Sequence, residues 1–141
     1  MSDAVAAVVI PAGPESAVNL RKPYAFPVAD CLFCAIVAGE IPATRVGETD
    51  RVLAFRDINP QAPSHVMVIS KVHYPDVAAL AAADGGLLGE MITEAHRVAV
   101  AEGVGDSGYR VVFNTGEQAG QTVPHVHAHV LGGRSLTWPP G

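Results

Sequence analysis

Three of the six histidines, His125, His127 and His129, alternate along one short stretch near the C-terminal end of the chain. The rest of this stretch, which runs to Leu131, is hydrophobic, and the pattern predicts a β-strand. Because side chains alternate between the two faces of a strand, all three imidazoles are expected on one face. Such a row fits chelation of a metal ion, reaction at a phosphorus atom, or an incidental polar face.

The length of the row weighs against a single metal ion. At about 3.3 Å per residue, the outer two side chains begin roughly 13 Å apart. One tetrahedral ion has ligand bonds of about 2 Å and does not easily reach all three. A row of subsites for phosphate oxygens, a nucleophile and a leaving group fits better. Neutral imidazole attacks phosphorus, and the central His127 is best flanked for that task.

A glycine-bearing loop, Asn114 to Thr122, lies directly upstream of the histidines and ends in Gln121 and Thr122. Glycine allows backbone N–H groups to approach a phosphate closely, so the loop is a candidate phosphate site. The alternative is a surface loop whose glycines serve its turns alone.

The only two cysteines, Cys31 and Cys34, have C-x-x-C spacing. Two cysteines are too few for the disulfide framework of a small secreted domain, and the spacing is half of a zinc motif. The other ligands must come from elsewhere in the chain. A pair of reduced, buried cysteines is the competing interpretation.

Hydrophobic periodicity predicts the elements that position these residues. Apolar residues recur at intervals of three and four over 86–101, which predicts a long amphipathic helix, and 31–38 has a shorter helical pattern. Strands are expected at 45–48, 51–56, 65–70, 109–114 and 125–131, with Thr49 and Asp50 as the tight connection between the first two. Without regular βαβ alternation, this set predicts an α+β fold whose antiparallel sheet is covered on one face.

Length and composition limit the possible classes of protein. The chain has 141 residues, of which 49% are hydrophobic, enough for one domain with a core. Residues 1–29 contain four prolines and are predicted to be a mobile arm ahead of the domain at 30–141. No apolar run reaches the length of a membrane span, and no basic segment resembles the start of a signal peptide, so a cytoplasmic location is expected. The net charge of −5 argues against duplex nucleic acid as a partner.

The chain resembles the histidine-triad (HIT) superfamily, and in particular its Hint branch. The motif that carries the resemblance is His125-Val126-His127-Ala128-His129-Val130-Leu131, preceded by Gly120-Gln121-Thr122-Val123. The likeness extends from Asp30 to the terminal Trp138-Pro139-Pro140-Gly141. It implies a five-stranded antiparallel sheet with two helices, paired into a homodimer. The implied reaction is hydrolysis of purine nucleoside 5′-phosphoramidates to a nucleoside monophosphate and an amine, through a nucleotidyl-histidine intermediate.

The resemblance also assigns a role to individual residues. His127 corresponds to the nucleophile, His129 and His65 lie beside the phosphate, and Thr122 lies near the departing amine. Asp57 corresponds to the residue that accepts hydrogen bonds from the ribose, and Trp138 borders the leaving-group pocket. The remaining nucleotide contacts implied are Asn114, Gly120 and Gln121 at the phosphate and ribose, and Phe33, Ile36, Phe55 and Ile58 as the walls of the purine slot.

Each of these residues has a structural alternative when it is considered alone. His65 would be a structural histidine, Asp57 a turn or cap residue, and the four apolar residues part of the core. Trp138 would pack over its own sheet. Pro124 stands where animal members of the family carry an aromatic residue, which affects the expected leaving group but not the chemistry.

Bacterial zinc-binding members of the family place two histidines with the C-x-x-C pair. The corresponding residues here are His73 and His125, which with Cys31 and Cys34 would hold a structural Zn²⁺. No catalytic cofactor is implied. The alternative leaves His73 on the surface, and His96 is expected to be simply solvated.

Two other functions remain open from the sequence. A dinucleoside polyphosphate hydrolase of the Fhit kind shares the histidine triad but lacks the C-terminal Trp-Pro-Pro-Gly. A nucleotide-binding interaction module with incidental turnover belongs to a different class.

Overall fold

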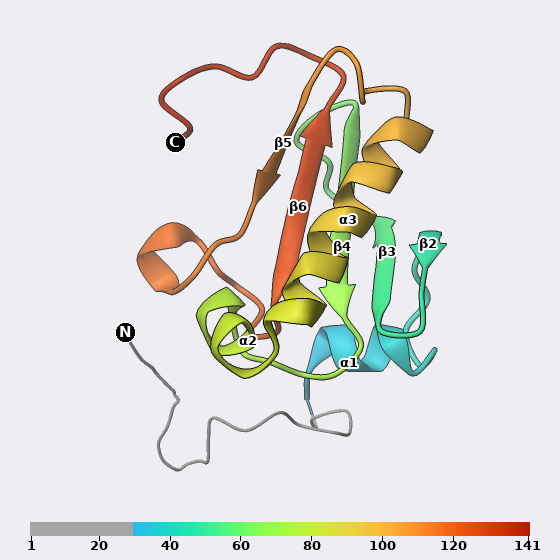
Figure 1. Cartoon of the computed structure of the whole chain (residues 1–141), viewed down its shortest axis with the longest axis vertical. Coiled ribbons are helices and arrows are strands. Elements are labelled where there is room, and N and C mark those ends of the chain that lie inside the picture. Colours follow the sequence, from blue (N-terminus) through green and yellow to red (C-terminus); the bar gives the residue numbers. More distant parts are fainter. Residues whose placement is uncertain (1–29) are drawn as a thin grey trace.

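A five-stranded antiparallel sheet forms the centre of the molecule (Figure 1). The structure is a computed structural model that describes residues 30–141, so the predicted arm at 1–29 lies outside the described residues. The strands are β2 (Arg45–Glu48), β3 (Val52–Arg56), β4 (Ser64–Ser70), β5 (Tyr109–Val112) and β6 (His127–Gly132), in the order β2-β3-β4-β6-β5. Every neighbouring pair is antiparallel, so the predicted fold class is confirmed.

The long amphipathic helix α3 (Gly85–Ala101) covers one face of the sheet, as predicted, and Figure 1 shows it crossing the central strands. Its apolar side, which includes Leu87, Met91 and Ala95, is buried against alternate residues of the strands. Asp84 begins the helix by accepting a hydrogen bond from the Leu87 N–H at 3.0 Å. Burial of this stripe is the main source of the helix's stability.

A second helix on this side, α2 (Val77–Ala83), was not predicted from the sequence. Its residues are apolar throughout, so no 3.6-residue period distinguishes it from a buried strand. Asp76 caps it by accepting a hydrogen bond from the Ala79 N–H at 2.8 Å, and alanine's high helix propensity supports the rest.

The short helix α1 (Leu32–Val37) packs on the opposite face of the sheet. Its residues Phe33 and Ile36 form a second apolar cluster with Leu53, Phe55 and Ile69. These strand residues alternate with those under α3, so both faces carry a helix. The expectation that only one face is covered is therefore wrong at this end of the sheet.

The hairpin between β2 and β3 differs from the prediction by one residue. The Thr49 N–H donates to the Val52 carbonyl at 2.8 Å, which makes Asp50 and Arg51 the connecting pair. Within residues 30–141, no helix has the length and apolar character needed to cross a bilayer.

Gly132, at the end of β6, packs closely against Val104 in the segment that follows α3, and a substitution at Gly132 tests this packing. A Cβ at this position would lie 2.9 Å from Cγ2 of the buried, β-branched Val104. We therefore expect Gly132→Ala to lower the free energy of unfolding by about 1–3 kcal/mol. Urea denaturation measures the change.

The matched control is Gly89→Ala, on the exposed side of α3, where a Cβ meets no atom within 4 Å. It should raise the free energy of unfolding by up to about 1 kcal/mol. Equal effects from the two substitutions would contradict the packing described at Gly132.

Candidate active site and metal centre

Strand β6 carries His127 and His129 on the face opposite α3. In the register they pair with Ile69 and Met67 of β4, whereas Ala128 and Val130 point into the core under α3. His125 was predicted to begin this strand, but β6 begins at His127. The reason is that the Val126 N–H donates to the Tyr74 carbonyl at 2.7 Å instead of to a neighbouring strand.

His127 is held in one tautomer by the backbone. Its Nδ1 donates to the carbonyl of His125 at 2.7 Å, and the ring packs edge-to-face on Phe33 with centroids 5.0 Å apart. A neutral imidazole has a single N–H, so Nε2 keeps its lone pair. Burial lowers the pKa of His127, which favours the neutral form at pH 7. This side chain therefore presents an oriented nucleophilic nitrogen.

His65 and His129 form a second chain of hydrogen bonds beside it. The Gln61 N–H donates to Nδ1 of His65 at 2.9 Å, so His65 carries its proton on Nε2. That proton is directed at Nδ1 of His129, which lies 2.9 Å from His65 Nε2. Asp57 Oδ2 also lies 3.3 Å from His65 Nε2. Nδ1 of His129 accepts, so its Nε2 holds the remaining N–H.

The electrostatics favour neutral rings in this chain of bonds. Burial, with His127 and His65 nearby, lowers the pKa of His129 to about 4. Burial also lowers the pKa of His65, against the opposing effect of Asp57. The row therefore supplies one lone pair, on His127, next to an uncharged N–H donor, on His129.

Asp57, His65 and His129 have potential ligand atoms within 4.8 Å of one another, the spacing of a small metal site. The hydrogen bond from Gln61 opposes that use, because a protonated Nε2 on His65 has no lone pair for an ion. The three side chains are better described as a hydrogen-bond network.

The C-x-x-C pair meets two histidines in a second, buried cluster. Nδ1 of His125 lies 3.4 Å from Cys31 Sγ and 3.6 Å from Cys34 Sγ, and Nδ1 of His73 lies 3.4 Å from Cys34 Sγ. The two Nδ1 atoms are 3.1 Å apart. A tetrahedral zinc ion separates such ligand atoms by about 3.3–3.8 Å, so the four residues fit the ion closely.

The surroundings of the cluster also suit zinc. His125 Nε2 donates to the Ser70 carbonyl at 2.7 Å, which leaves Nδ1 unprotonated toward the thiols. Burial lowers the pKa of His73 and His125 to about 4, so both rings are neutral as ligands must be. The predicted structural zinc site is confirmed as a buried set of four ligands, which leaves no position for a substrate.

The residues predicted to hold the purine lie together, with one exception. Phe33, Ile36 and Phe55 are buried beside the histidine row, with the Phe33 and Phe55 rings 5.7 Å apart. They belong to the core whether or not they also contact a base. Ile58 is 100% exposed on the loop after β3 and packs against none of them.

Gln121 fixes the shape of the glycine-bearing loop. Its Oε1 accepts from the Gly116 N–H at 3.0 Å, and its Nε2 donates to the carbonyls of Pro75 and Val123. Gly116 and Gly120 have positive φ angles of 87° and 88°, which a side chain would strain. Thr122 is exposed and Asn114 half-buried on the same segment.

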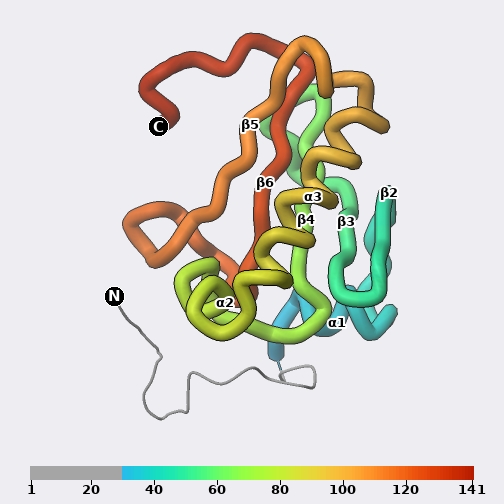
Figure 2. Tube along the Cα trace, in the orientation of Figure 1, coloured from blue at the N-terminus to red at the C-terminus, as the bar shows by residue number. Residues whose placement is uncertain are grey.

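The C-terminal tail, which follows β6 and ends at Gly141, runs outward past β5 (Figure 2). Trp138 is 81% exposed, so it does not pack over its own sheet. The Arg110 guanidinium donates to the Thr137 carbonyl at 3.0 Å and so holds the start of the tail.

Sequence reasoning missed the partners that set the tautomers. These are the Gln61 N–H and the carbonyls of Ser70 and His125. Every residue except proline carries both backbone groups, so the sequence contained no signal for them.

Comparisons with known proteins point to one family. The HIT domain matches residues 38–136. The chain is 44% identical over 107 residues to the purine nucleoside phosphoramidase of Escherichia coli, covering 76% of this chain and 90% of that protein. It is 49% identical over 113 residues to the 14 kDa zinc-binding protein of Zea mays, covering 78% and 87%. A solved HIT family hydrolase from Legionella pneumophila superposes with a TM-score of 0.77 at 50% identity, covering 79% of this chain and 100% of that one.

The cluster of two cysteines and two histidines predicts the metal content of the protein. Protein purified without chelators should contain about one zinc per chain by elemental analysis. Cys34→Ala should lose the metal and lower the free energy of unfolding by about 3–5 kcal/mol. His96→Ala, on the exposed side of α3, is the control and should keep the metal. Zinc-free wild-type protein would show that the cluster holds no ion.

Proposed function

Because this chain belongs to the HIT family of hydrolases, we propose that it cleaves the P–N bond of purine nucleoside 5′-phosphoramidates. The products are a nucleoside monophosphate and an amine. The observation that carries the proposal is the bond from His127 Nδ1 to the His125 carbonyl, which leaves Nε2 as a nucleophile of fixed direction. The E. coli relative named purine nucleoside phosphoramidase supports this choice of substrate.

The reaction proceeds by double displacement. His127 Nε2 attacks the α-phosphorus and the P–N bond breaks, and the nitrogen takes a proton from solvent and departs as the amine beside Thr122. Water then attacks the phosphorus of the nucleotidyl-histidine and returns a proton to solvent, which releases the monophosphate and restores His127. His129 stabilises charge on the phosphoryl oxygens through its Nε2–H, and His65 holds His129 in the tautomer that donates. The buried zinc site stabilises the fold and takes no part in the chemistry.

The nucleotide lies across the end of the sheet beside α1. The Asp57 carboxylate accepts from the ribose hydroxyls, since its bond to the Asn59 N–H at 2.8 Å leaves further lone pairs. Phe33, Ile36 and Phe55 border the base, and Ile58 becomes covered when the base binds. The loop at Gly120, with Asn114 and Gln121, borders the phosphate and ribose. Trp138 borders the leaving group.

We also propose that the protein is a homodimer that pairs through β5. This strand is the last in the sheet order, so one of its edges has no neighbouring strand within residues 30–141. Beside it, α3 exposes Ile92 and Val100 at eight-residue spacing. His96, midway between them, bonds the hydroxyl of Tyr109 in β5 at 2.8 Å, which shows that this side of α3 adjoins the strand. An edge with an adjacent apolar stripe fits a second copy across a two-fold axis.

The substrate preference distinguishes this proposal from its alternatives. Adenosine 5′-phosphoramidate should be hydrolysed with a higher kcat/KM than diadenosine polyphosphates. His127→Ala should lower kcat by at least about a thousandfold while AMP affinity changes little, because only transition-state interactions are lost. Arg51→Gln, at the β2–β3 hairpin on the opposite edge of the sheet, is the control and should match wild type. Faster cleavage of diadenosine polyphosphates would favour the Fhit kind, and AMP binding without accelerated turnover would favour a binding module.

The buried environment of His127 predicts the pH profile. The ring must be neutral to attack, and burial lowers its pKa, so the reactive form persists to lower pH than for an exposed histidine. The acidic limb of kcat/KM should therefore have its midpoint below the ordinary histidine value of about 6.5. His96→Gln should leave this limb in place. A midpoint at or above the ordinary value would contradict neutral, buried His127 as the nucleophile.

A further inference from the structure

Two arginines differ from every other basic residue in the described part of the chain. Within residues 30–141, each basic side chain except Arg110 and Arg134 has a carboxylate within 4.0 Å; the paired ones are Arg45, Arg51, Arg56, Lys71 and Arg97. Arg110 and Arg134 donate instead to neutral backbone carbonyls. The chain as a whole is acidic, with a net charge of −5. Two uncompensated guanidinium groups in such a chain are a local positive site.

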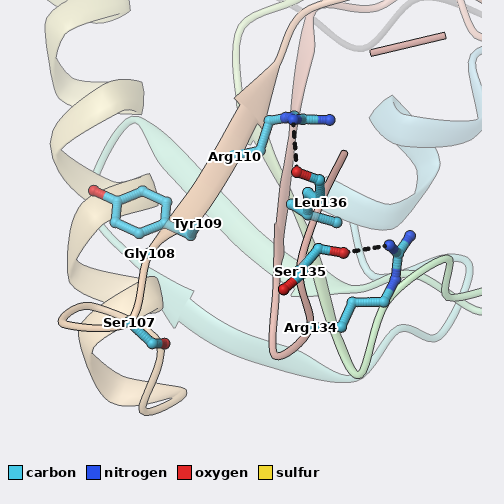
Figure 3. A pocket seen from close by; sticks show the side chains of 7 residues that line it. All are labelled: Ser107, Gly108, Tyr109, Arg110, Arg134, Ser135 and Leu136. Atoms are coloured by element: carbon cyan, nitrogen blue, oxygen red, sulfur yellow. Dashed lines mark hydrogen bonds between the residues drawn. The ribbon is translucent and has the colours of Figure 1, made fainter. Parts of the chain in front are cut away.

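Both arginines line one pocket, between the start of β5 and the segment that follows β6 (Figure 3). Ser107 and Ser135 add two hydroxyl groups to its wall. Figure 3 shows both guanidinium groups beside the Ser135–Leu136 segment. Positive charge with hydroxyl donors is the chemistry that binds a phosphate or a carboxylate.

Hydrogen bonds to backbone carbonyls hold each guanidinium in place, and other N–H groups of each guanidinium remain unused. Arg110 uses Nη2, which donates to the carbonyls of Leu136 at 3.4 Å and Thr137 at 3.0 Å. Arg134 uses one bond from Nη1, to Ser135 at 3.0 Å, and one from Nη2, to Gln61 at 2.9 Å. A guanidinium has five N–H donors, so each retains three for a ligand. The groups are thus oriented before any ligand arrives.

Arg110 lies on the same face of the sheet as His127 and His129. Arg110 pairs with Leu131 in the register between β5 and β6, and Val112 pairs with His129. Directly paired residues point to the same face, so Arg110 lies two residue pairs beyond His129, which is roughly 7 Å along the strand direction. An amine that departs beside Thr122 and extends along β6 past His129 would bring its far end toward Arg110.

We propose that Arg110 and Arg134 form an oxyanion-binding subsite next to the histidine row. Its ligand is a phosphate or carboxylate group, which is either a free anion or the acidic end of the leaving amine. The second source rests on the proposed function, and the first does not.

The single tryptophan provides a direct measure of binding. Trp138 follows Thr137, whose carbonyl Arg110 holds, so its fluorescence should respond when an anion engages Arg110. The protein is titrated with inorganic phosphate at constant ionic strength, with AMP present in excess to occupy the proposed nucleotide site. We expect a saturable change in wild type, and a midpoint raised roughly tenfold or more in Arg110→Gln and Arg134→Gln. Arg51→Gln, at the distant β2–β3 hairpin, is the matched control and should titrate as wild type.

A kinetic comparison identifies the source of the anion. Adenosine 5′-phosphoramidates of glycine and of glycinamide differ only in the charge at the end of the amine. If the subsite takes the leaving group, the glycine-to-glycinamide ratio of kcat/KM should fall roughly tenfold in Arg110→Gln. An unchanged ratio together with weakened phosphate binding would assign the subsite to a free anion.

Other results would overturn the subsite. Phosphate titrations that are flat in wild type, or identical in Arg110→Gln, with equal substrate ratios, would show that no oxyanion binds there. Dissociation of a dimer by Arg134→Gln without any phosphate response would assign the arginines to a contact between subunits. Phosphate binding that depends on the arginines, in a protein that hydrolyses no phosphoramidate, would refute the proposed function and leave the subsite standing.

Discussion

The site depends on the position of one residue, His125, whose two ring nitrogens and carbonyl oxygen all make contacts. Its Nδ1 faces the two thiols and His73, its Nε2 donates to Ser70, and its carbonyl receives the proton of His127. The metal centre and the proposed nucleophile are therefore separated by a single residue of backbone. The zinc ligands hold His125 in place, and the carbonyl of His125 in turn sets the direction in which His127 Nε2 points.

A second constraint is that a neutral imidazole carries only one proton. At His127 a backbone carbonyl uses that proton, which frees the other nitrogen for attack. At His65 a backbone N–H occupies Nδ1, which forces the proton to the nitrogen that faces His129. The same kind of side chain thus keeps a free lone pair in one place and donates a hydrogen bond in another. Burial keeps the rings neutral, so neither arrangement is lost at pH 7.

Elements with a clear hydrophobic period, and ligands with a characteristic motif spacing, were predictable from the sequence. The period of α3, the strands and the C-x-x-C pair each carry a signal that local chemistry explains. The uniform apolar run of α2 carries no such period. The start of β6 depends on Tyr74, and the exposure of Ile58 depends on how the loop after β3 settles. The partners that choose the tautomers are backbone groups brought close by folding, which no local pattern can reveal.

The bonds that make up the site join residues that are far apart in the chain. The contact between Cys31 and His125 spans 94 positions, that between Arg134 and Gln61 spans 73, and that between His65 and His129 spans 64. Bringing such distant residues together costs loop-closure entropy before the contact itself stabilises the fold. A partly folded chain can contain α3 or a hairpin, whose contacts are local, but the long-range contacts of the site are not yet formed in it. Catalytic competence should therefore arise in a single step late in folding, which would make the chemistry itself a measure of the completed native state.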